Sequence, residues 1–259
     1  MTNLFDLTGK VALITGGNGG VGLGFAQALA DHGADIAIWG TNETKNAVAK
    51  AQLEQTGRRV FTLRCDVGDH EAVGEAMTET VGALGRLDAC FVNAGVPGAG
   101  VPFVDFTMEE WHRVMRVNLD GAFSTAQAAC RVMKAQFERE GVGGSIVFSS
   151  SGSAFQGQQK GQHYGASKAG LNAMMRAIAV EHARHAIRAT SLVIGWTESE
   201  MTAPSFALKK FADNVIPRIP MRRWGQPSDL GGIAVYLTSD ASSWHTGDII
   251  TLDGGYSIF

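Results

Sequence analysis

The chain has 259 residues, 45% of them hydrophobic and 18% charged, which suits one large α/β domain with a sizeable core. Its formal net charge of −3 gives no electrostatic reason to expect nucleic acid or an anionic membrane as a partner. No run approaches the roughly 20 apolar residues of a membrane span, and the first ten residues lack the pattern of a signal peptide, so a cytoplasmic location is expected.

Short apolar runs alternate with longer segments of helical period along the chain. The predicted strands are 11–15, 35–39, 60–64, 89–92, 145–149, 189–194 and 248–252. The predicted helices lie near 20–32, 42–56, 69–84, 108–138, 163–185 and 227–238. Because the strands are apolar on both faces and alternate with helices, the fold class predicted is α/β, a doubly wound parallel sheet of about seven strands with helices on both faces.

The segment 197–226 interrupts this alternation. It has no clear period and contains Pro204, Pro217 and Pro220. Long loops inside a compact domain are usually functional, so we interpret the segment as a lid over the substrate.

The first predicted strand runs directly into a glycine-rich turn, GGNGGVG, and then a helix. Gly16, Gly20 and Gly22 have the spacing of a dinucleotide-binding turn, in which glycine lets the backbone N–H groups approach a pyrophosphate. The helix N-terminus then stabilises the anion. A glycine-rich turn without a ligand is the alternative for this motif alone.

The residues after the second predicted strand bear on the choice of dinucleotide. Gly40 stands where an NAD-binding chain has an acid for the ribose hydroxyls, and Gly19 and Thr41 stand where an NADP-binding chain has arginine. Thr41 and Asn18 offer neutral hydrogen-bonding groups for a 2′-hydroxyl. This pattern favours NAD, with NADP as the alternative.

Tyr164 and Lys168 are four residues apart on a predicted helix, so they share a face. A free tyrosine has a pKa of about 10, and a nearby ammonium lowers that pKa toward the range of a general acid or base. Ser151 follows the predicted strand 145–149, at the sheet edge where ligands bind in this architecture. A solvated helix face is the alternative for the Tyr–Lys pair alone. His163 adjoins Tyr164, but consecutive helix residues point about 100° apart, so we expect no catalytic role for it.

Taken together, these motifs resemble those of the short-chain dehydrogenase/reductase family over nearly the whole chain. The positions that match are Thr15 to Gly22 for the glycine motif, Asp66 and Val67 after the third strand, Asn93-Ala94-Gly95 after the fourth, Asn118 on the long helix, Ser151, and Tyr164 with Lys168. The resemblance implies a single Rossmann-type domain over residues 1–259 that binds a nicotinamide dinucleotide.

The resemblance also implies roles for the matching residues. Tyr164 would exchange a proton with the substrate oxygen, which Ser151 would hold and polarise. Lys168 would lower the pKa of Tyr164 and bind the nicotinamide ribose, and Asn118 would hold a water for proton relay. The predicted cofactor contacts are Gly16, Asn18, Gly20, Gly22, Thr41, Asp66, Val67, Asn93, Ala94, Gly95, Tyr164, Lys168, Thr197 and Ser199.

The chain departs from the family after the sixth predicted strand. Ile194 stands in place of the usual proline, and Ser199 stands in the register of a cofactor-contacting threonine, with Thr197 as the alternative. The aromatic residues Trp196, Phe206 and Phe211 follow, and they suit either a substrate wall or the core.

The substrate class is left open by the sequence. Sugar acids, 3-oxoacyl thioesters and cyclic alcohols or ketones all fit, and Gln156, Gln158 and Gln162 would suit a polar substrate, although at least two of them are expected on the surface. The family resemblance implies a homotetramer. A catalytically idle dinucleotide-binding protein is the alternative function, and a methyl transferase ranks last because it has no need of the Tyr–Lys pair.

The three cysteines are Cys65, Cys90 and Cys130. Their odd number, wide spacing and apolar neighbours indicate buried free thiols in a reducing compartment, and no metal site is expected.

Overall fold

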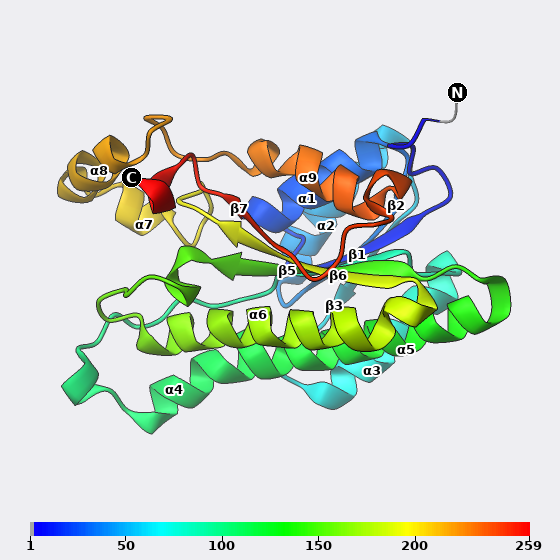
Figure 1. Cartoon of the computed structure of the whole chain (residues 1–259), viewed down its shortest axis with the longest axis horizontal. Helices are drawn as coiled ribbons and strands as arrows, with labels where there is room; N and C mark the ends of the chain where they lie inside the picture. Colours follow the sequence, from blue (N-terminus) through cyan, green and yellow to red (C-terminus); the bar gives the residue numbers. More distant parts are fainter. Residues whose placement is uncertain (1–2) are drawn as a thin grey trace.

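The computed structural model describes residues 3–259, and in it seven strands form one parallel sheet in the order β3-β2-β1-β4-β5-β6-β7 (Figure 1). Their bounds are β1 Val11–Thr15, β2 Asp35–Gly40, β3 Val60–Arg64, β4 Ala89–Val92, β5 Gly144–Ser151, β6 Ile187–Ile194 and β7 Ile249–Leu252. The predicted fold class and all seven predicted strands are confirmed, with β5 and β6 each longer than predicted.

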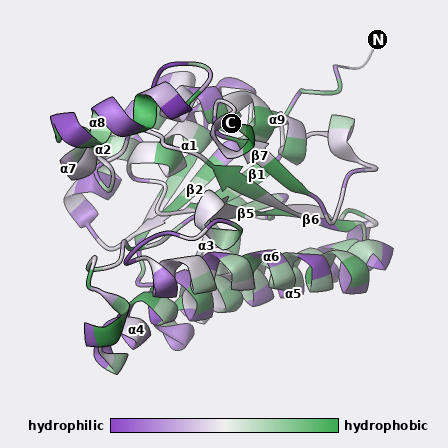
Figure 2. Ribbon diagram, turned by 60° about the vertical axis from the view of Figure 1, so that its left-hand side comes forward, coloured by the Kyte–Doolittle hydropathy of each residue, from purple (hydrophilic) through white to green (hydrophobic). Residues whose placement is uncertain are grey.

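Helices cover both faces of the sheet (Figure 1). Their bounds are α1 Gly20–Asp31, α2 Glu43–Leu53, α3 His70–Leu84, α4 Met108–Met115, α5 Gly121–Glu140, α6 Gln162–His182, α7 Ala203–Phe206, α8 Lys209–Val215 and α9 Gly231–Thr238. One core cluster packs α3, α5 and α6 against the sheet, and the other packs α1, α2 and α9 against the opposite face. The strands therefore lie between two apolar layers, with polar helix surfaces outside (Figure 2).

The long helix predicted over 108–138 is in fact interrupted. A π turn, Arg116–Asp120, separates α4 from α5 and contains the fully buried Asn118. The five residues of this turn include no proline or glycine, so the sequence pattern did not reveal it. Single π turns inside helices are frequent at functional sites.

Two further features concern the sequence predictions. The segment 197–226 is not wholly irregular, because α7 and α8 lie within it. The three cysteines are free and buried, as predicted, and burial raises the pKa of the Cys65 and Cys130 thiols to about 11.

No helix among residues 3–259 combines the length and the apolar character needed to cross a bilayer.

The strand order reverses direction between β1 and β4, which lie side by side at the centre of the sheet. In open α/β sheets, the crevice outside the carboxyl ends of the strands at such a point is where ligands bind. The glycine turn after β1 and the Asn93 turn after β4 both open onto this crevice.

Candidate active site

The glycine turn between β1 and α1 has the backbone that a phosphate-binding turn requires. Gly16 and Gly20 have φ angles of 64° and 49°, in the left-handed region that favours glycine. A Cβ added at Gly22 would lie 2.3 Å from the carbonyl oxygen of Gly16. The first turn of α1 has no side-chain cap and no acidic residue, so its N–H groups are available to an anion. These residues fit the pyrophosphate of a dinucleotide.

Gly40, at the end of β2, is covered by two asparagine side chains. Asn18 Nδ2 donates to Asn46 Oδ1 at 2.7 Å, and a Cβ at Gly40 would lie 2.3 Å from that nitrogen. The space of the missing acid is therefore filled by the Asn18–Asn46 bond. The amide nitrogen of Asn18 is engaged with Asn46, and Thr41 is exposed.

Asp66, the predicted adenine contact, accepts hydrogen bonds from its own turn and from the π turn that follows α4. Its Oδ1 accepts from the Gly68 N–H at 2.9 Å, and its Oδ2 accepts from both terminal nitrogens of Arg116 at 3.0 Å. The neighbouring Val67 is buried against Gly121. Arg116 was not among the predicted site residues, because it lies 50 residues from Asp66 in the sequence.

Asn93 and Ala94 tie the ends of three strands together. Both backbone N–H groups donate to Thr15 Oγ1, at 2.9 and 3.0 Å. The Asn93 side chain donates to the Thr15 carbonyl at 3.0 Å and accepts from Ser149 Oγ at 2.9 Å. The turn after β4 is thus fixed to β1 on one side and to β5 on the other.

Asn118 and Lys168 both lie close to Gly95. A Cβ at Gly95 would lie 3.3 Å from Asn118 Oδ1 and 3.7 Å from Lys168 Nζ. Asn118 accepts from the Val96 N–H at 2.7 Å and donates to the Val96 carbonyl at 3.0 Å. The amide of Asn118 therefore holds the start of the loop that follows Gly95.

Tyr164 and Lys168 lie in the first two turns of α6, next to the end of β5. Lys168 Nζ lies 5.5 Å from the centroid of the Tyr164 ring and donates to the Ser149 carbonyl at 2.7 Å. Burial lowers the pKa of Lys168 to about 8. Ser151 is the last residue of β5, and its hydroxyl acts to lower the pKa of Tyr164. The residues predicted to be catalytic are thus brought to one edge of the sheet.

The predicted direction of the Tyr164 pKa shift is wrong for this structure. Burial raises the pKa of Tyr164, and the hydrogen bond from Ser151 lowers it by less. The Lys168 ammonium lies 5.5 Å from the ring centroid and donates to the Ser149 carbonyl, and burial of the phenol remains the larger effect.

Thr197 and Ser199 follow β6 and lie in different settings. Thr197 is buried, and its hydroxyl donates to the Gly195 carbonyl at 3.2 Å. Ser199 is half-buried, and its Cβ lies 2.9 Å from the position of a Cβ added at Gly20. Ser199 is therefore the better placed of the two to meet a ligand on the glycine turn.

His163 has a structural partner that the sequence did not reveal. It is fully buried, and its Nε2–H donates to Glu110 Oε1 at 3.2 Å. Glu110 also accepts from Arg113 and from the Ala99 N–H, and the Arg113 bonds contribute most to lowering the pKa of Glu110 to about 2. Arg113 in turn donates to the Pro97 carbonyl at 2.7 Å. This network fastens the loop after Gly95 to α4 and α6.

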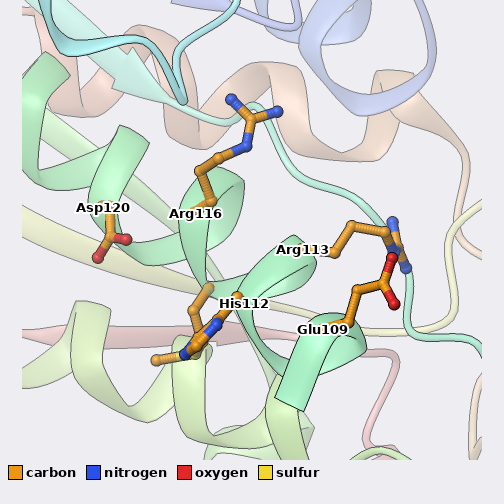
Figure 3. Close-up of a pocket in the computed structure, with 6 residues that line it drawn as sticks. Glu109, His112, Arg113, Arg116 and Asp120 are labelled. Atoms are coloured by element: carbon orange, nitrogen blue, oxygen red, sulfur yellow. The ribbon is translucent and has the colours of Figure 1, made fainter. Parts of the chain in front are cut away.

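A surface hollow of about 470 Å³ lies on the outer side of α4 and the π turn (Figure 3). Its lining includes Arg113 and Arg116, which extend from it in different directions. Arg113 reaches the loop after Gly95, and Arg116 reaches Asp66. The hollow includes none of the predicted catalytic side chains.

The aromatic residues of 197–226 pack on one another. Phe206 stacks on Trp224 with ring centroids 3.9 Å apart, and Trp196 meets Phe211 edge to face at 5.1 Å. Trp224 was not singled out from the sequence. These contacts give the segment an apolar centre of its own.

The chain as a whole is similar to proteins of known sequence and structure, several of which are named as dehydrogenases or reductases of sugars or sugar acids. A family model described as enoyl-(acyl carrier protein) reductase matches residues 16–257. An L-rhamnose 1-dehydrogenase (NAD(P)(+)) from Sphingomonas sp. (strain SKA58) is 34% identical over 96% of each chain. A sorbose reductase from Schizosaccharomyces pombe is 36% identical over 99% of each chain. The solved structure of a gluconate 5-dehydrogenase from Burkholderia cenocepacia J2315 in complex with NADP and tartrate is 33% identical, with a TM-score of 0.92 over 99% of this chain and 98% of that chain.

Proposed function

Because the chain belongs to the short-chain dehydrogenase/reductase family of NAD(P)-dependent oxidoreductases acting on CH–OH groups, we propose that it interconverts a secondary alcohol and a ketone of a sugar or sugar acid. The observation that carries the proposal is the meeting of Ser151, Tyr164 and Lys168 at the carboxyl edge of the sheet, beside the glycine turn.

In the direction of alcohol oxidation, Tyr164 takes the hydroxyl proton while the carbinol C–H bond breaks with its electron pair. The nicotinamide ring, when bound, supplies the acceptor for that hydride. Ser151 holds the substrate oxygen by donating to it, and Lys168 holds the ribose with the ammonium hydrogens not used by Ser149. Asn118, beside Lys168, supports the relay of the proton toward solvent.

A polyhydroxylated substrate is supported by the relatives named above, which act on rhamnose, sorbose and gluconate, by their names. Gln156 and Gln158 are exposed, as expected for two of the three glutamines. In this proposal the segment 197–226 closes over the substrate.

NAD is the preferred cofactor in this proposal. Asn18 and Asn46 fill the space at Gly40 with neutral amides, and the ammonium of Lys45 is already paired with Glu200. A 2′-phosphate would therefore lack a free cation there, whereas a 2′-hydroxyl needs none. Relatives use both dinucleotides by their names, so the direct comparison is the dissociation constant of NAD against that of NADP.

The assembly proposed is a homotetramer in the cytoplasm. The outer faces of α5 and α6 expose Phe123 and Val180, which are 50% and 84% accessible and would be covered in an oligomer. The buried free thiols suit a reducing compartment.

The test is a panel of sugars, sugar acids, 3-oxoacyl thioesters and cyclic ketones, followed by the absorbance of the reduced nicotinamide. Turnover confined to the polyhydroxylated compounds is expected. Turnover of thioesters or cyclic ketones alone would contradict the substrate class, and cofactor binding without any turnover would favour the idle dinucleotide-binding protein.

A further inference from the structure

The side-chain amide of Asn46, on α2, is fixed by the backbone beneath it. Its Nδ2 donates to the carbonyl oxygens of Gly40 at 2.9 Å and of Leu63 at 3.2 Å, and the residue is only 4% exposed. A carbonyl oxygen only accepts hydrogen bonds, so the opposite orientation of this amide would set its own oxygen against two acceptors in a buried place. The Oδ1 of Asn46 is therefore committed to accepting from Asn18.

The fixed oxygen of Asn46 in turn decides how the Asn18 amide is oriented. Asn18 Nδ2 donates to Asn46 Oδ1 at 2.7 Å, and the same nitrogen would lie 2.3 Å from a Cβ added at Gly40. Because an amide group is planar, holding its nitrogen against Asn46 and Gly40 turns its oxygen away from the end of β2. Asn18 is half-buried in the glycine turn, so the atom that it presents to a ligand there is Oδ1, an acceptor.

An acceptor at this place distinguishes the two nicotinamide dinucleotides. The ribose of NAD carries a 2′-hydroxyl, which can donate to an amide oxygen as it can to a carboxylate. The 2′-phosphate of NADP is an anion with strong acceptor oxygens, so it needs a donor and would meet an oxygen instead. An amide that could turn freely would offer either of its ends and would distinguish the two dinucleotides less.

We propose that Asn46 is a positioning residue for cofactor choice, which holds the Asn18 amide so that Oδ1 accepts from the ribose 2′-hydroxyl in place of the acid that Gly40 lacks. The proposal rests on the proposed binding of a dinucleotide at the glycine turn, and it gives the preference for NAD a physical origin. Asn46 acts only through Asn18. Gly40 belongs to the same arrangement, because a side chain there would displace both amides.

The experiment compares the dissociation constants of 5′-AMP, 2′-deoxy-5′-AMP and 2′,5′-ADP by isothermal titration calorimetry, without turnover. Asn18→Ala should reduce the preference for 5′-AMP over 2′-deoxy-5′-AMP by about three- to tenfold, which is what one neutral hydrogen bond contributes. Asn46→Ser keeps a donor for a backbone carbonyl but has a shorter side chain that leaves Asn18 unheld. It should reduce the same preference and should bind 2′,5′-ADP more tightly relative to 5′-AMP.

Two controls separate this role of Asn46 from a structural one. In an Asn18→Ala background, Asn46→Ser should change neither ratio, because Asn46 acts through Asn18. Val48→Ala alters an exposed side chain on the same helix and should leave both ratios at their wild-type values. Asn46→Thr, which fills more of the space, repeats the test if Asn46→Ser is too unstable to measure.

The outcomes distinguish this proposal from the proposed function. If Asn18→Ala leaves the preference for 5′-AMP over 2′-deoxy-5′-AMP unchanged, or if Asn46→Ser weakens all three nucleotides alike, the proposal is overturned while nucleotide binding stands. If the folded wild type binds none of the three nucleotides, the dinucleotide site itself is contradicted, and the proposed function with it.

Discussion

Lys168 Nζ donates to the carbonyl oxygen of Ser149 at 2.7 Å, and this bond holds a buried ammonium at the carboxyl edge of β5. Removing an ammonium from water disfavours its charged form, which is why the pKa of Lys168 is lowered to about 8. Burying the Lys168 ammonium therefore costs folding free energy. The same position keeps a cation beside the places proposed for the ribose and for the Tyr164 phenol.

The cost of burying Lys168 should be visible in the pH dependence of stability. Between about pH 8 and its ordinary value of 10.5, Lys168 binds fewer protons in the folded than in the unfolded state, so its contribution to stability rises with pH through that window. Lys168→Met removes this contribution. The free energy of unfolding of the wild type minus that of Lys168→Met should rise by on the order of 3 kcal/mol between pH 7 and pH 10.5.

Urea denaturation of both proteins at several pH values measures this difference. Other groups that titrate in the same range, the three cysteines included, are common to both proteins and largely cancel. A difference that stays constant, or that falls as the pH rises, would show that Lys168 is not held with a lowered pKa.

Releasing Lys45 from Glu200 should shift the cofactor preference toward NADP. Both side chains are largely exposed, at 43% and 75%, so the pair is weak and the effect modest. Glu200→Gln should tighten the binding of 2′,5′-ADP relative to 5′-AMP by about two- to fivefold, as measured by isothermal titration calorimetry. Glu198→Gln, two residues away and without an ion pair to Lys45, is the matched control and should leave the ratio unchanged. An unchanged ratio in Glu200→Gln would mean that Lys45 does not reach the 2′ position.

The His163–Glu110 bond should affect substrate binding more than cofactor binding. It fastens the loop after Gly95 to α6, next to Tyr164. His163→Leu should raise the KM for the sugar roughly tenfold, since a hydrogen bond to a charged carboxylate is lost, with the dissociation constant of the dinucleotide unchanged.

His163→Gln keeps an N–H at the position of Nε2 and should recover most of the lost affinity for the sugar. Steady-state kinetics with fluorescence titration of the cofactor separates the two constants. If the affinities for the sugar and for the dinucleotide weaken together, in proportion to a lower melting temperature, the variant has instead lost structure generally.

The sheet and the ends of its strands could be predicted from the sequence, because each strand is a short apolar run that is followed by turn-forming residues. The glycine turn, Asn93, Ser151 and Tyr164 all follow such runs, and parallel strands bring their carboxyl ends to one edge. The interruption at Asn118 could not be predicted, because the π turn Arg116–Asp120 contains no proline or glycine that would mark it.

Pairs that meet only through the tertiary fold were not predicted from the sequence. Arg116 reaches Asp66 across 50 residues, and Lys45 reaches Glu200 across 155. The pKa of Tyr164 was predicted in the wrong direction for a related reason. Helical spacing places a lysine near a tyrosine, but it gives neither the burial of the phenol nor the carbonyl toward which the ammonium turns.

The central claim is that Tyr164 exchanges the proton with the substrate oxygen, and Tyr164→Phe tests it most directly. The measurement is single-turnover hydride transfer, followed at the absorbance of the reduced nicotinamide, with the dissociation constant of the cofactor determined on the same protein. The account predicts a rate lower by about 10²- to 10⁴-fold with cofactor binding retained. A variant that transfers hydride within a few-fold of the wild-type rate would contradict it.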